Sequence, residues 1–126
     1  MVLAKETDVA DFLLIYQGGD PSWRERPQAE IDAAMQAWGQ WFKQLESTGN
    51  LRNPGAPLGR DGVVVRANGR GVQTDMAMAE VKELIGGFSI IAAESLEQAA
   101  ELAKQAPFLR NNPTGSVVVR PILQMG

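Results

Sequence analysis

Two residue types that carry much of enzyme chemistry are missing from this chain of 126 residues. It has no cysteine, which excludes disulfides, thiolate metal sites and cysteine nucleophiles. It has no histidine, which excludes Ser-His-Asp catalysis, zinc bound by histidine and haem held by a proximal histidine. The acidic residues show no EF-hand-like spacing. We therefore predict neither a metal nor a cofactor.

Positive charge and long hydrophobic runs are also scarce. The chain has 12 basic and 15 acidic residues, whereas most nucleic-acid binders carry a basic excess, so we expect no nucleic-acid partner. Its apolar runs are only a few residues long, and a membrane span needs about 20, so we expect no membrane partner. Residues 1–10 lack the apolar segment of a secretory signal and are interpreted as a polar leader. Residues 11–126 are predicted to form one domain, and its location is expected to be cytoplasmic.

Hydrophobic residues make up 44% of the chain, enough for a packed core, and their spacing predicts short strands and two helices. Strands are expected at residues 12–16, 84–93 and 116–120. A long helix is expected at 27–48, beginning near Pro27 and ending before Gly49, a residue suited to a helix C-terminus. Its predicted core-facing stripe comprises Ile31, Met35, Trp38, Phe42 and Leu45.

The middle and the end of the chain carry equally clear signals. The Pro/Gly-rich segment 50–62 is expected to be a loop, and Asn68-Gly69 between two β-prone runs predicts a hairpin over 63–74. Segment 75–82 is ambiguous. Ser95, with Gln98 three positions on, marks a helix start, and Pro107 is expected to end that helix. The fold predicted from this order is α+β, ferredoxin-like βαββαβ with a β-hairpin extension.

The predicted strands are apolar on both sides rather than alternating. Two helices on one face of a sheet leave the other face uncovered, and large exposed apolar patches are unusual in soluble monomers. The simplest cover is a second copy of the chain around a two-fold axis. The sequence therefore predicts a homodimer, against the alternative of a partly buried sheet with a few tolerated valines.

One stretch of the sequence resembles a known family. Residues 79–88 read AEVKELIGGF, which is similar to the segment that follows the DGPF signature of YCII-related (DGPF-domain) proteins. The similarity continues in register across residues 11–122, through the segments LLIY at 13–16, SLEQA at 95–99 and VRPI at 119–122. This resemblance implies a dimeric α/β-barrel arrangement with a cleft at the subunit boundary. It implies no settled reaction.

The signature itself is degenerate here. Where the family has DGPF, this chain has Asp75 followed by Met76, Ala77 and Met78, so the turn that Gly-Pro would impose is lost. Some relatives carry a histidine–aspartate pair, which a chain without histidine cannot form.

Six residues are candidates for a functional site. Asp75 and Glu80 could act as general bases, and Lys82 beside them could anchor an anionic ligand. The competing interpretation is that Asp75 ends the hairpin, while Glu80 and Lys82 form an exposed ion pair. Tyr16, Trp23 and Trp41 could contact a ligand, although a tyrosine or tryptophan more often only packs its ring.

Three functions remain open from the sequence. The first is a domain that binds a small molecule in a cleft at the dimer interface. The second is a cofactor-free isomerase or lyase that moves a proton with Asp75 or Glu80, an idea that rests on fold-level analogy. The third is a structural or protein-interaction subunit.

Overall fold

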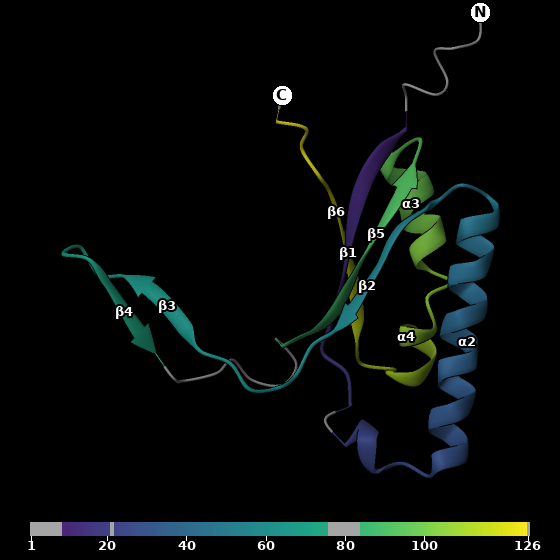
Figure 1. Ribbon diagram of the computed structural model, residues 1–126, viewed down its shortest axis with the longest axis horizontal. Helices are drawn as coiled ribbons and strands as arrows, with labels where there is room; N and C mark the ends of the chain where they lie inside the picture. Colours follow the sequence, from purple (N-terminus) through teal and green to yellow (C-terminus); the bar gives the residue numbers. More distant parts are fainter. Residues whose placement is uncertain (1–8, 21, 76–83, 126) are drawn as a thin grey trace, which may run out of the picture.

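The computed structural model describes residues 9–20, 22–75 and 84–125. A four-stranded sheet forms the centre of the molecule, and the helices pack on one of its faces (Figure 1). The elements, in chain order, are β1 (Ala10–Gln17), the 3-10 helix η1 (Trp23–Glu25), α2 (Gln28–Ser47), β2 (Leu51–Pro57), β3 (Val64–Ala67), β4 (Val72–Asp75), β5 (Ile85–Ala93), α3 (Leu96–Ala103), α4 (Pro107–Asn111) and β6 (Ser116–Pro121).

The sheet has the strand order β2-β5-β1-β6, and every pairing in it is antiparallel. Its strands and main helices follow one another in the chain as β1-α2-β2-β5-α3-β6, which is the βαββαβ arrangement of ferredoxin-like folds. The predicted fold class, including the hairpin extension, is therefore confirmed. The arrangement of two copies stays a prediction.

Alternating side chains give the sheet two different faces. On β1, Phe12, Leu14 and Tyr16 point toward the helices and are at most 5% exposed. We call this side the helical face. The opposite side, which we call the open face, is centred on half-buried apolar side chains that lie opposite one another on three strands: Leu13, Ile15, Phe88, Ile90 and Val118.

The core lies between the helical face and the helices. Large side chains from β1, α2 and β5 meet there, joined by small residues of α3 and the segment after it, in a cluster made up of Phe12, Leu14, Tyr16, Trp41, Leu45, Ile91, Ala93, Ala99, Ala103 and Ala106. Ala99 and Ala103 are buried on α3, because small side chains let that helix lie close to the sheet.

The predicted stripe of α2 was partly wrong. Met35 is 63% exposed, whereas Trp41, which the predicted stripe does not include, is only 4% exposed. The helix is turned by about one residue from the expected orientation, so that Ala34, Trp41 and Leu45 are its buried residues. Trp38 belongs to both stripes and packs partly against the core. Periodicity indicated an amphipathic helix, but it did not decide between two neighbouring faces.

Both predicted helix-end signals are confirmed. After α2, Gly49 has a φ of 78°, and the N–H groups of Gly49 and Asn50 donate to the carbonyl oxygens of Glu46 and Leu45, the Schellman pattern. At the start of α3, the Gln98 N–H donates to Ser95 Oγ over 3.0 Å. The Gln98 side-chain oxygen in turn accepts a hydrogen bond from the Glu94 N–H over 2.6 Å.

The predicted end of that helix was wrong. α3 stops at Ala103, and Pro107 begins the short helix α4 instead of ending α3. Proline suits a first helical position because the N–H that it lacks would have no partner there. The turn at residues 104–106 therefore separates two helices, and it brings α4 beside α2.

The predicted loop at 50–62 was also partly wrong, because residues 51–57 form the edge strand β2. Proline is tolerated at a sheet edge, and the register shifts on either side of Asn53. Gly55 has a φ of 75°, and a Cβ there would lie 1.7 Å from the Phe88 carbonyl oxygen. The Pro/Gly content that predicted a loop instead builds an irregular strand with a close backbone approach.

The predicted hairpin is confirmed as β3 and β4, paired from Val64↔Asp75 to Ala67↔Val72. It forms a separate two-stranded sheet that extends away from the helices (Figure 1). We call β3 and β4 the arm. The DGPF-like segment and the ambiguous residues after Asp75 lie at 76–83, outside the described residues.

Candidate functional site

Tyr16 is a core residue whose hydroxyl is fully engaged. The hydroxyl donates to Ser89 Oγ over 2.8 Å, and the Ser89 hydroxyl donates to the Pro54 carbonyl oxygen over 2.8 Å. Burial raises the pKa of Tyr16 to about 12, although the bond with Ser89 opposes the rise. The relay ties the central strands β1 and β5 to the irregular edge strand β2.

Aromatic rings connect Tyr16 to a second candidate. The Trp38 ring meets Tyr16 edge-on at 5.1 Å between centroids and meets Trp41 edge-on at 5.8 Å. Such edge-to-face pairs are favoured by the aromatic quadrupole. Tyr16 and Trp41 therefore belong to one aromatic row inside the helical layer.

Trp23 belongs to a different cluster. The Arg26 guanidinium lies 5.2 Å from the centre of the Trp23 ring, a cation–π contact. The same guanidinium donates to Asp20 over 2.7 and 3.1 Å. Hydrogen bonds from Ser22, followed by those from Arg26, hold the pKa of Asp20 at about 2. Neither Asp20 nor Arg26 was predicted as a site residue, because nothing in the residue pattern at 18–26 predicts that these two side chains pair.

Trp41 forms part of a groove of about 390 Å³ between α2 and the turn from α3 to α4. Its indole Nε1 is buried and has no hydrogen-bond partner among the described residues. A buried donor left without an acceptor costs about 1–3 kcal/mol. The other lining residues are mostly amides and cations: Ala37, Gln40, Gln44, Lys104, Gln105 and Arg110.

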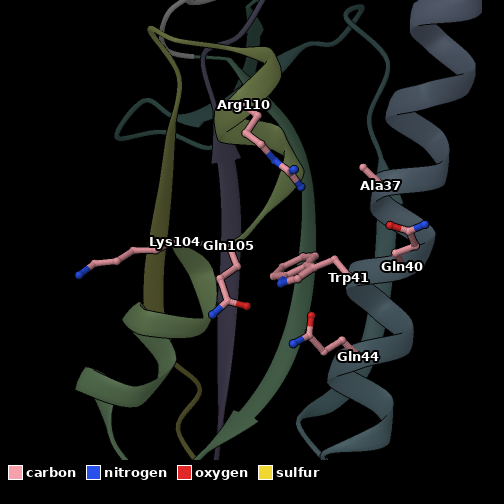
Figure 2. A pocket seen from close by; sticks show the side chains of 7 residues that line it. All are labelled: Ala37, Gln40, Trp41, Gln44, Lys104, Gln105 and Arg110. Atoms are coloured by element: carbon pink, nitrogen blue, oxygen red, sulfur yellow. The ribbon is translucent and has the colours of Figure 1, made fainter.

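Four of these side chains converge. Figure 2 shows the Arg110 guanidinium reaching from α4 into the space beside α2, above the Trp41 indole. The Gln44 and Gln105 amides approach each other below the ring. Lys104 extends away from the groove and pairs with Glu101. Sequence reasoning named Trp41 as a ligand candidate but missed Arg110, which comes from a separate segment.

The described side chains do not test the predicted general bases or the predicted anion-binding lysine. Asp75 is the last residue of β4, opposite Val64 at the base of the arm, and only its backbone is described. Glu80 and Lys82 lie outside the described residues. Their catalytic and anion-binding roles stay predictions, as does the competing interpretation of a hairpin end and an exposed ion pair.

Neither a cluster of metal-ligating side chains nor a membrane-spanning helix occurs in the described ranges. There, no three acidic side chains gather closely enough to hold a metal ion. The same ranges contain no helix with the length and apolar character needed to cross a membrane.

Comparison with known proteins decides the family. The family model of the YCII-related domain matches residues 12–126, nearly the whole described domain. This chain belongs to the YCII-related domain family. The resemblance seen at residues 79–88 and in the closing VRPI segment is thereby confirmed. No curated protein matches this YCII-related domain.

A solved structure of another protein is similar to this YCII-related domain. It is the 5-chloro-2-hydroxyhydroquinone dehydrochlorinase TftG from Burkholderia phenoliruptrix AC1100, in complex with 2,5-dihydroxybenzoquinone. The two are 20% identical with a TM-score of 0.49, and the match covers 91% of this chain and 95% of TftG.

Proposed function

We propose that this YCII-related domain is a homodimer that binds a small molecule in a cleft between the open faces of its two sheets. The observation that carries the proposal is the character of the open face. Leu13 and Ile15 of β1 meet Ile90 and Phe88 of β5 there, and Val118 extends the patch onto β6. These side chains are only half-buried in one chain, and the helices lie on the other side of the sheet.

The arm supports the same arrangement. It pairs only within its own two-stranded sheet, and isolated hairpins are marginally stable in water. Two valines of the arm are strongly exposed, Val65 at 60% and Val72 at 74%, and so is Val63 just before β3 at 51%. The arm extends on the side of the sheet opposite the helices, where a second copy would pack (Figure 1). Burial of these valines against that copy would stabilise both the arm and the dimer.

The charges at the open face indicate the class of ligand. Asp11 and Arg52 neutralise each other in an ion pair of 2.9 Å. Arg120 lies opposite Leu13 on β6, and its side chain has no hydrogen bond or ion pair within the described ranges. An apolar face with one unpaired guanidinium at its border suits an apolar molecule that carries a weakly acidic group.

Sedimentation equilibrium at micromolar concentration tests the dimer. We expect the mass of two chains, and Ile15→Glu should give one chain because it places a charge in the interface. Met35→Glu introduces the same charge on the exposed side of α2 and should leave the dimer intact. Circular dichroism of both variants checks that the fold is kept. A wild-type protein that sediments as a folded single chain would contradict the proposal.

Thermal shift with a panel of aromatic carboxylic acids and their neutral amides tests the binding site. A ligand that binds the native state raises the melting temperature. We expect the acids to give the larger rise, and Arg120→Gln to reduce it. No rise with any acid at saturating concentration would count against a ligand in this cleft, whatever the mass of the assembly.

A further inference from the structure

We propose that the groove between α2 and the α3–α4 turn is a separate binding site for a small organic carboxylate, with Trp41 and Arg110 as its donors. The groove lies on the helical side of the sheet, away from the open face. The inference therefore does not rest on the proposed dimer or on its cleft.

The first support is the unused donor of Trp41. The side chain is 4% exposed, and its Nε1 atom has no partner among the described residues. Buried indole N–H groups are normally hydrogen-bonded. Figure 2 shows the nitrogen side of the ring facing the space between Gln44 and Gln105. Both glutamines are exposed, so their side chains can turn aside and admit an acceptor to the indole.

The second support is the set of groups around that donor. Arg110 offers guanidinium N–H donors and no acceptor, and its side chain has no hydrogen bond or ion pair within the described ranges. Among the described residues no carboxylate lines the groove, and Lys104 is already paired with Glu101. One unopposed positive charge beside an indole N–H favours a ligand with anionic oxygen acceptors.

A carboxylate fits these donors better than other acceptors of similar size. A carboxylate offers only acceptors, which matches a guanidinium and an indole N–H that offer only donors. The amides of Gln44 and Gln105 can donate to or accept from polar substituents on the rest of the molecule. The volume of about 390 Å³ lies at the small end of ordinary ligand pockets, which limits the ligand to a compact molecule.

Nuclear magnetic resonance of the indole N–H groups tests the site directly. The chain has three tryptophans, so ¹⁵N-labelled protein gives three indole signals, and the Trp41 signal is assigned from the spectrum of Trp41→Phe or by through-bond experiments. Benzoate is the probe, and benzamide is its neutral counterpart of the same shape. We expect benzoate to move the Trp41 signal saturably downfield, with little change at Trp23. Benzamide should cause a much smaller change.

Two arginine variants form the matched comparison. Arg110→Gln should weaken benzoate binding about tenfold or more, which is the usual effect of losing a hydrogen bond to a charged group. Arg24→Gln removes the same charge from η1 and should leave the affinity unchanged. Both side chains are exposed, so both variants should fold. Arg120→Gln should also leave the Trp41 shift unchanged, which separates this site from the proposed cleft.

Three results would overturn the inference. The first is a Trp41 signal that does not respond to benzoate at concentrations that leave the protein folded. The second is an equal response to benzamide, which would remove the role of the charge. The third is an unchanged affinity in Arg110→Gln. The first result would leave the indole N–H to water, and the other two would remove Arg110 as the group that selects a carboxylate.

Discussion

The helical face and the open face are built from alternate residues of the same strands, yet their side chains differ in burial within one chain. On β1, Leu14 is completely buried under the helices, while its neighbours Leu13 and Ile15 are only half-buried on the other side. The helical face also holds a closed polar relay from Tyr16 through Ser89 to the Pro54 carbonyl oxygen. The open face holds an exposed ion pair and Arg120, whose side chain has no partner among the described residues.

This difference indicates that the residues of the two faces contribute differently to the stability of the folded chain. The helical face is completed within the chain, so its residues set the stability of the folded chain. The open face is apolar and no helix of the described residues covers it, so its residues contribute less to the stability of a single chain. The following variants, from the largest expected effect to the smallest, test this difference between the two faces.

The largest expected difference lies between two neighbouring leucines. Leu14→Ala should lower the free energy of unfolding by about 2–5 kcal/mol, because it leaves a cavity in a packed core. Leu13→Ala removes the same atoms from the open face and should cost clearly less in dilute protein. Urea unfolding of both variants measures this. In concentrated protein, the loss of unfolding free energy caused by Leu13→Ala should grow if the open face is an interface. Equal losses for the two variants at every concentration would contradict the distinction between the faces.

The next effect concerns pH and the buried tyrosine. Because the pKa of Tyr16 is raised to about 12, the folded state keeps a proton that the unfolded chain loses near pH 10. Stability from this group is complete below pH 10 and falls by up to about 2–3 kcal/mol as the pH rises to 12. Tyr16 is the only tyrosine, so phenolate absorbance follows its titration without overlap.

Tyr16→Phe is the control for this pH dependence. The variant should lose about 0.5–1.5 kcal/mol at neutral pH, where the hydrogen bond to Ser89 is missing. Between pH 10 and 12 its unfolding free energy should fall less steeply than that of the wild type. A phenol that titrates near 10 in the folded protein would show that the relay is open to water.

The smallest effect is expected on the open face, at the Asp11–Arg52 ion pair. Both side chains are nearly half exposed, so a double-mutant cycle with Asp11→Asn and Arg52→Gln should give a coupling of at most about 1 kcal/mol. Added salt should weaken it further. A larger, salt-resistant coupling would mean that the pair is buried in the assembled protein, which would sharpen the case for a dimer.

The candidate site could be predicted from the sequence only in part. Aromatic residues are scarce enough that Trp41 stood out as a ligand candidate. Its partners Arg110 and Gln105 could not be found, since they come from a segment more than 60 positions away whose path depends on where α3 ends. Tyr16 was also noticed, but the buried hydroxyl of Ser89 that accepts from it lies on another strand.

The sequence by itself determined β1, α2, the hairpin, β5, α3 and β6, together with the helix ends at Gly49 and Ser95 and the family. These features depend on local properties, such as the φ freedom of glycine or the spacing of a capping box. Such properties belong to residues that are close together in the sequence. The tertiary structure alone decided which side of α2 is buried, that a Pro/Gly-rich segment becomes the edge strand β2, and which side chains meet around Trp41. Those outcomes depend on packing between segments far apart in the chain, where burial and shape outweigh local preference.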